Sequence, residues 1–295
     1  MLKVTVFTPT YNRGYIIKRL YESLCRQSVK SFEWIVINDG SMDNTDQLFK
    51  VWMECNNDFE IRYYTCSNQG KHSAINRAVE LAEGELFFIV DSDDYLCEHA
   101  IETILSKEST LPQNNFAGIA FNRGYDRDNI IGKTFSGDYV DATALERRKF
   151  KIIGDKAEVF YTDILKKYKF PVFEREKFLT EGVVWYEIAN DGYQLRWYNE
   201  IIYICNYLED GLTYNSTLAE NNFNGYTYST KKILKFNLSF IEKFIMIGNY
   251  MDTSLKVGIT SKQASANINV PIFLLYLSFI ALLIKRKLKL WIKRS

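Results

Sequence analysis

Between Lys3 and Val90 the chain alternates between short apolar runs and segments whose apolar positions recur every three to four residues. The apolar runs have the length and the β-branched or aromatic content of strands, and they are 3–8, 32–37, 61–64 and 86–90. Between the first two runs, Ile17, Leu20 and Leu24 share one face of a helix, and similar patterns follow the second and third runs. This order predicts an α/β fold with a mainly parallel sheet flanked by helices.

Each of these predicted strands ends in a short polar motif. The four motifs are Pro9–Gly14, Asn38–Ser41, Asn68–Lys71 and Asp91–Asp94. Ligands of open parallel sheets bind beyond the carboxyl ends of the strands. We therefore expect the four motifs to lie around one ligand site.

The motif Asp91-Ser92-Asp93-Asp94 carries the most chemistry, because clustered carboxylates behind a buried strand repel one another unless water or a cation is present. Side chains alternate along extended backbone, so Asp91 and Asp93 share a face. Hard oxygen ligands of this kind suit Mg²⁺ or Mn²⁺, which usually also hold phosphates. The alternative is a solvated acidic turn that caps a helix beginning near Glu98.

The four motifs together resemble those of the family 2 glycosyltransferases, which have the GT-A fold and invert the anomeric configuration of a sugar taken from a nucleotide-sugar donor. The matching segments are 8–13, 37–41 with Asp43 and Thr45, 68–71 with Ala74 and Asn76, and 91–94. The resemblance is strong over about the first hundred residues. It is looser around Glu181 and fades after about Thr213.

The resemblance implies roles for individual residues. Tyr11 would stack on the nucleobase, Asp39 would accept a hydrogen bond from it, which favours uracil, and Lys71 would meet the phosphates. Asp91 and Asp93 would bind the metal, Mn²⁺ or Mg²⁺. The residues assigned to the donor are Thr8, Pro9, Tyr11, Arg13, Asp39, Asn68, Lys71, Asp91 and Ser92, and those assigned to catalysis are Glu181, Asp93 and Asp94. Singly, Tyr11 is also explained as a packed aromatic, Asp39 as a turn residue and Lys71 as a surface lysine.

Inverting transfer needs a base on the face opposite the departing diphosphate, so the base is expected outside the acidic motif. Thr180 can cap a helix that ends near Asp191, which places Glu181 in its first turn. Many members of the family carry an aspartate at the next position, where this chain has Gly182. Glu181 is then the candidate base, although an acid there is also a common helix cap. Trp185 either stacks on an acceptor sugar or packs in the core.

The composition fits one catalytic domain with an appendage. The 295 residues are 47% hydrophobic, and the five cysteines suggest neither a disulfide framework nor a zinc site. Because Lys3 opens a strand, we expect no signal peptide. His72 and His99 both lie near the donor motifs, so water or a carboxylate would complete the metal site. We divide the chain into a glycosyltransferase domain at 1–215, with donor binding at 1–100 and the acceptor side at 101–215, and a helical region at 216–295.

The second half is less informative. Residues 116–122, 193–198 and 201–204 are predicted strands, 207–213 is a predicted loop returning to the site, and the charged stretch up to Asp155 is expected to form acceptor-side loops or ordinary surface. The Gln-x-x-Arg-Trp segment of processive synthases is absent, since Gln194-Leu195-Arg196-Trp197 has a different spacing. Transfer of one sugar per encounter is therefore favoured.

The C-terminal end combines an apolar run at 270–284 with six basic residues and no acid at 285–294. Removing those six from the 37 basic residues leaves 31 against 36 acidic ones, a net charge of about −5 elsewhere. As a helix the apolar run would reach ~22 Å, short of the ~30 Å hydrocarbon core. An amphipathic helix on an anionic membrane surface is predicted, and the alternative is a helix packed in the core or in a homo-oligomer interface.

Taken together, the sequence predicts a metal-dependent inverting hexosyl- or N-acetylhexosaminyltransferase. Its partners would be a nucleotide-sugar donor, expected to be a UDP-sugar because of Asp39, and a glycan or lipid-linked acceptor of surface polysaccharide synthesis. It would work in the cytoplasm at the inner face of the cell membrane, without nucleic acid. The alternatives are a sugar nucleotidyltransferase and a non-catalytic module that binds nucleotide sugars or glycans.

Overall fold

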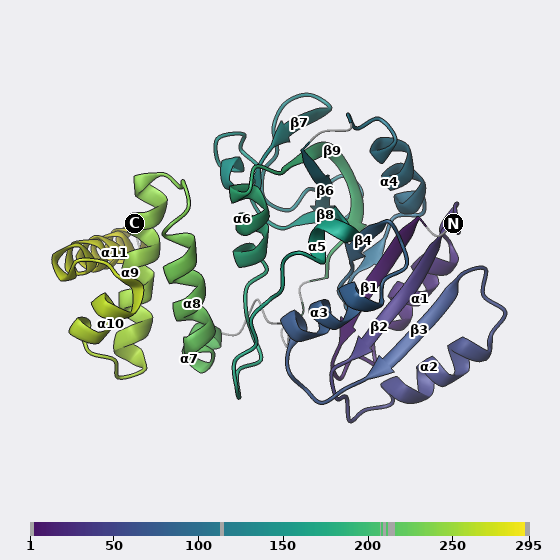
Figure 1. The fold of residues 1–295 in the computed structure, drawn as a ribbon, viewed down its shortest axis with the longest axis horizontal. Coiled ribbons are helices and arrows are strands. Elements are labelled where there is room, and N and C mark those ends of the chain that lie inside the picture. The colour runs from purple at the N-terminus through teal and green to yellow at the C-terminus, as the bar shows by residue number, and fades with distance from the viewer. Residues whose placement is uncertain (1–2, 113–114, 207, 209–210, 212–215, 293–295) are drawn as a thin grey trace.

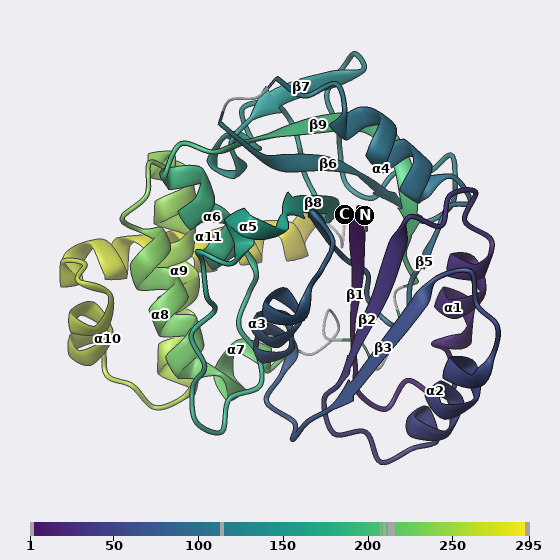
Figure 2. The ribbon, with the colours of Figure 1, turned by 45° about the vertical axis from the view of Figure 1, so that its right-hand side comes forward.

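The computed structural model describes residues 3–112, 115–206, 208, 211 and 216–292. Nine strands of this described part form one sheet in the order β3-β2-β1-β4-β8-β6-β9-β5, with β7 paired to β9. Helices lie on both faces of the sheet, and the C-terminal helices gather at one end of the molecule (Figures 1 and 2). The predicted α/β fold is confirmed, and the sheet is mixed.

The first four strands run parallel, as the alternating pattern predicts. They are β1 (Val4–Thr10), β2 (Phe32–Asn38), β3 (Glu60–Thr65) and β4 (Leu86–Ile89), and they are connected by α1 (Lys18–Cys25), α2 (Thr45–Glu54) and α3 (Lys71–Leu81). Alternate side chains enter opposite cores: Val6 and Trp34 pack on one face of the sheet, and Phe7 and Ile35 on the other. The inner strands β1, β2 and β4 are almost wholly buried because both faces are covered, whereas the edge strand β3 is partly exposed.

The second half of the sheet differs from the sequence prediction in three places. Its elements are β5 (Tyr95–Leu96), α4 (Ala100–Glu108), β6 (Phe116–Gly124), β7 (Tyr139–Ala142), the 3₁₀ helix η1 (Ala144–Glu146), β8 (Lys156–Tyr161), α5 (Thr162–Leu165), α6 (Gly182–Asn190) and β9 (Gln194–Ile204). The two strands predicted at 193–198 and 201–204 are one strand, β9. The stretch expected to form loops contains β7 and η1. The pattern does not predict β8, which lies antiparallel between β4 and β6.

Helices α1, α2 and α4 cover one face of the sheet, where Leu20, Phe49 and Ile101 enter the same core cluster. Helices α3, α5 and α6 cover the other face through Ala74, Leu165 and Val183. The apolar stripes of these helices account for their placement. The carboxyl ends of β1, β2 and β4 are left open at one edge, where the polar motifs lie.

The C-terminal helices are α7 (Leu218–Asn221), α8 (Phe223–Ile233), α9 (Phe240–Lys256), α10 (Ser261–Ile268) and α11 (Ile272–Ile292). Helices α8 to α11 share a third core cluster built around Tyr250 and Leu275. α11 lies closely on α9, because a Cβ at Gly248 would stand 2.7 Å from the carbonyl oxygen of Ser278. One face of the C-terminal helix is thus packed inside the protein, as the alternative prediction had it.

A reciprocal set of hydrogen bonds joins α8 to the segment before α6. Glu176 accepts the backbone N–H groups of Asn224 and Gly225, each at 2.7 Å. Asn222 in turn accepts the N–H groups of Lys177 and Phe178 at 2.8 and 2.9 Å. The predicted domain boundary at 215 and most of the predicted loop at 207–213 lie outside the described residues, so both stay predictions.

Within the described residues, no single helix has both the length and the apolar character that crossing a membrane requires. Only the pair Ser261–Ile268 and Ile272–Leu288, bent by 107° at its break, meets those criteria jointly.

Candidate active site

The loop predicted to hold the nucleobase is braced by the loop that follows β2. Asn12 donates its backbone N–H to Ser41 Oγ and accepts that of Met42, both at 2.8 Å, and Gly14 donates to Asp43 Oδ2 at 2.8 Å. Asn12 takes a positive φ of 52°, which asparagine tolerates better than most residues. Tyr11 stands on this loop with 42% of its surface exposed. Its ring is therefore accessible for stacking.

Asp39 fixes the turn that precedes α3. Its buried carboxylate accepts the backbone N–H of Gln69 at 2.8 Å and that of Gly70 at 2.7 Å. Gly70 has φ +88°, and a Cβ there would come within 1.9 Å of the carbonyl oxygen of Lys177, so only glycine fits. Asp39 thus acts as a turn residue, and its contact with a base stays a prediction. The turn delivers Lys71 as the first residue of α3.

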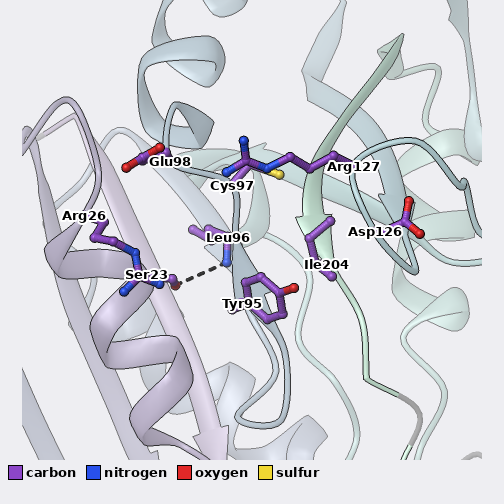
Figure 3. A pocket seen from close by; sticks show the side chains of 9 residues that line it. All are labelled: Ser23, Arg26, Tyr95, Leu96, Cys97, Glu98, Asp126, Arg127 and Ile204. Carbon is purple, nitrogen blue, oxygen red and sulfur yellow. Dashed lines mark hydrogen bonds between the residues drawn. The ribbon is translucent and has the colours of Figure 1, made fainter.

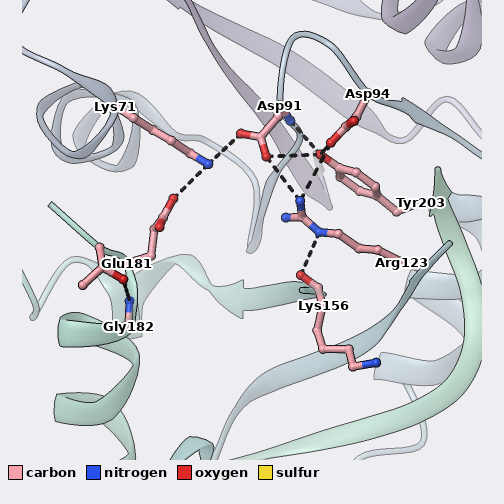
Figure 4. Close-up of polar contacts among 9 residues, drawn as sticks. Lys71, Asp91, Asp94, Arg123, Lys156, Glu181, Gly182 and Tyr203 are labelled. Atoms are coloured by element: carbon pink, nitrogen blue, oxygen red, sulfur yellow. Dashed lines mark hydrogen bonds and ion pairs between the residues drawn. The ribbon is translucent and has the colours of Figure 1, made fainter. Parts of the chain in front are cut away.

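Lys71 bridges two acids from different parts of the chain. Its Nζ lies 2.6 Å from Asp91 Oδ1 and 2.8 Å from Glu181 Oε1, and 23% of its side chain is exposed (Figure 4). Burial lowers the pKa of the Lys71 ammonium, but Asp91 and Glu181 outweigh burial and raise this pKa above its usual range. Lys71 is therefore a charged member of the site, and the solvated surface lysine is excluded.

Arg123, at the end of β6, holds the acidic motif from the other side. Its NH1 lies 3.2 Å from Asp91 Oδ2 and 3.9 Å from Asp94 Oδ2, and its guanidinium lies 4.1 Å from the centre of the Tyr203 ring. The Tyr203 hydroxyl donates to Asp94 Oδ2 at 2.7 Å, and Asn206 N–H donates to Asp94 Oδ1 at 2.8 Å. These partners replace the water that buried carboxylates need.

The acids of the motif differ in charge state as a result. Burial would raise the pKa of the Asp91 carboxyl, but Lys71 and Arg123 hold this pKa well below its usual range. Burial, and then repulsion from Asp91, raises the pKa of Asp94 to about 7. The motif is neither solvated nor a helix cap, since α4 begins at Ala100 without a side-chain cap. The alternative of an exposed capping turn is wrong.

Asp93 is the acid of the motif that no other residue pairs: within the described part of the chain, its carboxylate has no hydrogen bond or ion pair beyond the contact with its own backbone N–H. Burial, and then Asp91, raises its pKa. A cation would relieve both effects, so Asp93 fits a metal ligand. No three His, Cys, Asp or Glu side chains of the described residues are grouped to hold a metal by themselves. Mg²⁺ and Mn²⁺ often bind one or two carboxylates and take their other ligands from phosphates and water.

Of the other predicted donor residues, two are buried and three lie at the open edge of the sheet. The Thr8 hydroxyl accepts the indole N–H of Trp34 at 3.0 Å inside the core, so it supports the strand. Ser92 is also buried. The guanidinium of Arg13 lies 5.9 Å from the centre of the Tyr15 ring beside the nucleobase loop. Pro9 and Asn68 lie at the ends of β1 and β3, around the same edge of the sheet.

Glu181 precedes α6 by one residue. The helix begins at Gly182, so the cap position falls on Glu181 and not on Thr180, whose hydroxyl accepts the N–H of Gly182 at only 3.4 Å. The Glu181 side chain makes no capping hydrogen bond, so the capping alternative is wrong. Trp185 packs on Phe160, with ring centres 4.4 Å apart, which supports its place in the core.

Sequence reasoning missed Arg123 and Tyr203. Arg123 carries the signal used for the other motifs, a polar residue at the end of a predicted strand, here followed by Gly124. Tyr203 gives no such signal, because it lies within the apolar run Ile201–Ile204. Its role follows from the antiparallel pairing that sets Tyr95 opposite Ile204 beside Asp94.

A cavity of about 190 Å³ lies between α1, β5 and the loop after β6. Figure 3 shows Arg26 and Glu98 on one side of it and Asp126 and Arg127 on the other, with Tyr95 between. Ser23 Oγ accepts the N–H of Leu96 at 3.2 Å on its wall. None of the predicted donor residues lines this cavity.

A family model described as glycosyl transferase family 2 matches residues 5–173, more than half of the chain. The chain belongs to glycosyl transferase family 2. Among curated relatives of this glycosyltransferase is the GalNAc(5)-diNAcBac-PP-undecaprenol beta-1,3-glucosyltransferase of Campylobacter jejuni, 26% identical over 197 residues, which are 65% of this chain and 61% of the relative. Another relative is Glycosyltransferase GlyA of Streptococcus pneumoniae, 26% identical over 180 residues, which are 60% of this chain and 26% of the relative. The chain thus spans less than two thirds of the length of either relative.

Solved structures show the same GT-A fold. Residues 1–349 of S. aureus TarS in complex with UDP-GlcNAc superimpose with a TM-score of 0.62 and 19% identity, covering 86% of this glycosyltransferase and 73% of that chain. The mannosyltransferase PcManGT of Pyrobaculum calidifontis, in complex with GDP-Man and Mn²⁺, gives a TM-score of 0.53 and 16% identity over 97% of this chain and 75% of that one. Family membership favours a glycosyltransferase over a nucleotidyltransferase or a binding module.

Proposed function

We propose that this glycosyltransferase is metal-dependent and inverting, and that it transfers a hexosyl or N-acetylhexosaminyl group from a UDP-sugar to a glycan or lipid-linked acceptor. The observation that carries the proposal is the cluster of Lys71, Asp91, Arg123 and Asp94 at the carboxyl end of the parallel strands, in the same motif as Asp93, which no other described residue pairs. Binding of UDP-GlcNAc by TarS supports a UDP-linked donor.

The donor would lie across the open edge of the sheet. Tyr11 offers its exposed ring to the base, and Asp39 holds the turn that brings Lys71 to the diphosphate. Asp93, with Asp91 beside it, would hold Mn²⁺ or Mg²⁺, and the metal when bound neutralises charge on the diphosphate. The Mn²⁺ in the PcManGT complex supports this proposal.

The chemistry assigned to the chain's own residues is a single displacement. The acceptor hydroxyl gives its proton to Glu181 as its oxygen forms a bond to the anomeric carbon, and the bond from that carbon to the phosphate oxygen breaks. The electron pair of the broken bond leaves with the nucleoside diphosphate, whose charge faces Lys71. Glu181 fits the base because Lys71 contacts its Oε1, and no other described residue pairs with its Oε2, which can take the proton.

A lipid-linked acceptor is supported by the undecaprenol-linked substrate in the name of the Campylobacter jejuni relative and by the outer face of α11. That face carries a continuous stripe of exposed apolar side chains. They are Ile272, Phe273, Tyr276, Leu277, Ile280, Leu283, Ile284 and Leu288. The exposed Lys285 and Lys287 adjoin the stripe.

We therefore propose that α11 rests on an anionic membrane surface, with the apolar stripe in the interface and the basic side chains on the headgroups. The opposite side of α11 is fixed to α9, where Arg286 forms a two-pronged ion pair with Asp252 at 2.9 and 3.0 Å. This fixed geometry would hold the open edge of the sheet near lipid-linked substrates, at the inner face of the cell membrane.

The experiment that tests the proposed function offers a panel of UDP- and GDP-sugars to the full chain with Mn²⁺. Turnover is measured as release of the nucleoside diphosphate. With water in place of the acceptor, slow hydrolysis of one UDP-sugar is expected. Preference for a GDP-sugar would refute the UDP assignment, and failure to turn over any member of the panel would refute donor use at this site.

A further inference from the structure

The backbone on both sides of Glu181 is anchored in the core through Leu179 and Val183, whereas the Glu181 side chain is 27% exposed. Glu181 occupies the cap position of α6 without making a capping hydrogen bond, and Gly182 follows it. A Cβ at Gly182 would meet only the Thr180 hydroxyl, at 3.5 Å. Within the described residues, the Glu181 carboxylate is therefore held by its ion pair with Lys71 and not by the start of α6.

Lys71, by contrast, is fixed from several sides. It is the first residue of α3, and the turn before it is held by the two hydrogen bonds from Gln69 and Gly70 to Asp39. Gly70 also lies directly against the carbonyl of Lys177, four residues before Glu181. The Lys71 ammonium therefore has a defined position, and Glu181 Oε1 lies 2.8 Å from it.

The same ammonium keeps two like charges together. Asp91 Oδ1 and Glu181 Oε1 both lie within 2.8 Å of Lys71 Nζ. Without this cation the two carboxylates would repel each other, and Glu181 with the first turn of α6 would shift, because Asp91 keeps its second partner Arg123.

We propose that Lys71 is the positioning residue for Glu181, and that it holds this carboxylate in place for proton transfer in addition to meeting the donor phosphates. This inference rests on the proposed function, since it takes Glu181 as the base. It links the two halves of the site: the cation that faces the leaving group also orients the group that receives the acceptor proton.

Kinetics test the link through a double-mutant cycle on hydrolysis of the fastest UDP-sugar of the panel with Mn²⁺. Lys71→Met should lower kcat by about 10²-fold or more in the wild-type background, and this loss should be smaller by about tenfold or more in the Glu181→Gln background, where only the contact of Lys71 with the donor phosphates is left to lose. Lys71→Arg should recover most of kcat. An equal loss of kcat from Lys71→Met in both backgrounds would overturn the proposal, because Lys71 would then act on the donor alone.

Amide hydrogen exchange gives a second test that needs no turnover and so separates this inference from the proposed function. Lys71→Met should speed exchange in peptides covering residues 180–186 without speeding it in β1 or β2. The matched control is Lys232→Met, which removes another ammonium paired with α6, through Glu187, away from the acidic motif. Unchanged exchange at 180–186 in Lys71→Met, or an equal change in Lys232→Met, would overturn the positioning role.

Discussion

Replacing Arg123 with methionine should destabilise the fold by about 3–5 kcal/mol, the cost of removing one partner from a buried ion pair. The guanidinium is only 14% exposed and lies 3.2 Å from Asp91 and 3.9 Å from Asp94. At an effective dielectric constant of about 20, each such contact is worth about 4 kcal/mol. Two such contacts would exceed the predicted cost of about 3–5 kcal/mol, but water entry and the remaining partners, Lys71 on Asp91 and Tyr203 on Asp94, reduce the loss of stability to that range.

The cause can be isolated with Asp94→Asn. If the cost comes from leaving carboxylates without a cation, Arg123→Met should cost about 1–2 kcal/mol less in the Asp94→Asn background, where one acid is neutral. Arg196→Met is the matched control, because Arg196 forms a similar two-pronged pair with Asp141 on β7. Its cost should be the same in both backgrounds.

The assay is urea unfolding followed by circular dichroism, with EDTA present so that no divalent cation replaces the guanidinium. Equal costs of Arg123→Met with and without Asp94→Asn would refute the electrostatic account. So would a cost below about 1 kcal/mol, since that is the value of an exposed ion pair.

Three further outcomes are expected. Glu181→Gln should lower kcat for UDP-sugar hydrolysis by about 10²–10⁴-fold with nearly unchanged UDP affinity, and Gly182→Asp should raise the rate if that position faces the acceptor; weaker UDP binding at unchanged kcat would speak against a base. Lys285→Gln with Lys287→Gln should weaken binding to anionic vesicles at low salt by about tenfold or more and leave hydrolysis unchanged, whereas unaltered vesicle binding would remove the basic contribution. Burial, and then Arg147, lowers the pKa of Lys156 from 10.5 to about 8. The free energy of unfolding of the wild type should therefore fall by up to about 3 kcal/mol, relative to Lys156→Met, as the pH is lowered from 10.5 to about 8. Parallel curves of unfolding free energy against pH for the two proteins would contradict this.

Deleting α11 would not test membrane binding, because Leu275 and Ser278 on its inner face are buried. Removing the helix would expose the third core cluster, and loss of vesicle binding would then report unfolding.

The sequence predicted the first half of the sheet well because local signals agree there. β1, β2 and β4 are buried on both faces, each following helix has one apolar stripe, and each motif follows a strand end. Parallel topology then brings Lys71 and Asp91 to the same edge without further information. Glu181, by contrast, reaches Lys71 only through the tertiary fold, which the local pattern does not predict.

The rest depended on pairing between distant segments. β8 reads as a mixed run from Lys156 to Tyr161, and its buried Lys156 is satisfied by Asn122, 34 residues earlier. Asn199 and Glu200 suggested a break, yet β9 continues through them with an irregular register against β6. The end of β6 pointed to Arg123, but its partners could not be read locally, because they come from the loop after β4 and from β9.

The measurement that tests the central claim most directly is hydrolysis of the UDP-sugar panel followed by proton NMR, comparing wild type with Asp93→Ala in the presence of Mn²⁺. The wild type should release UDP and a sugar whose first-formed anomer is inverted relative to the donor, and both Asp93→Ala and excess EDTA should abolish most turnover while the fold stays intact. Full turnover by Asp93→Ala or in excess EDTA, or release of the retained anomer, would contradict the account.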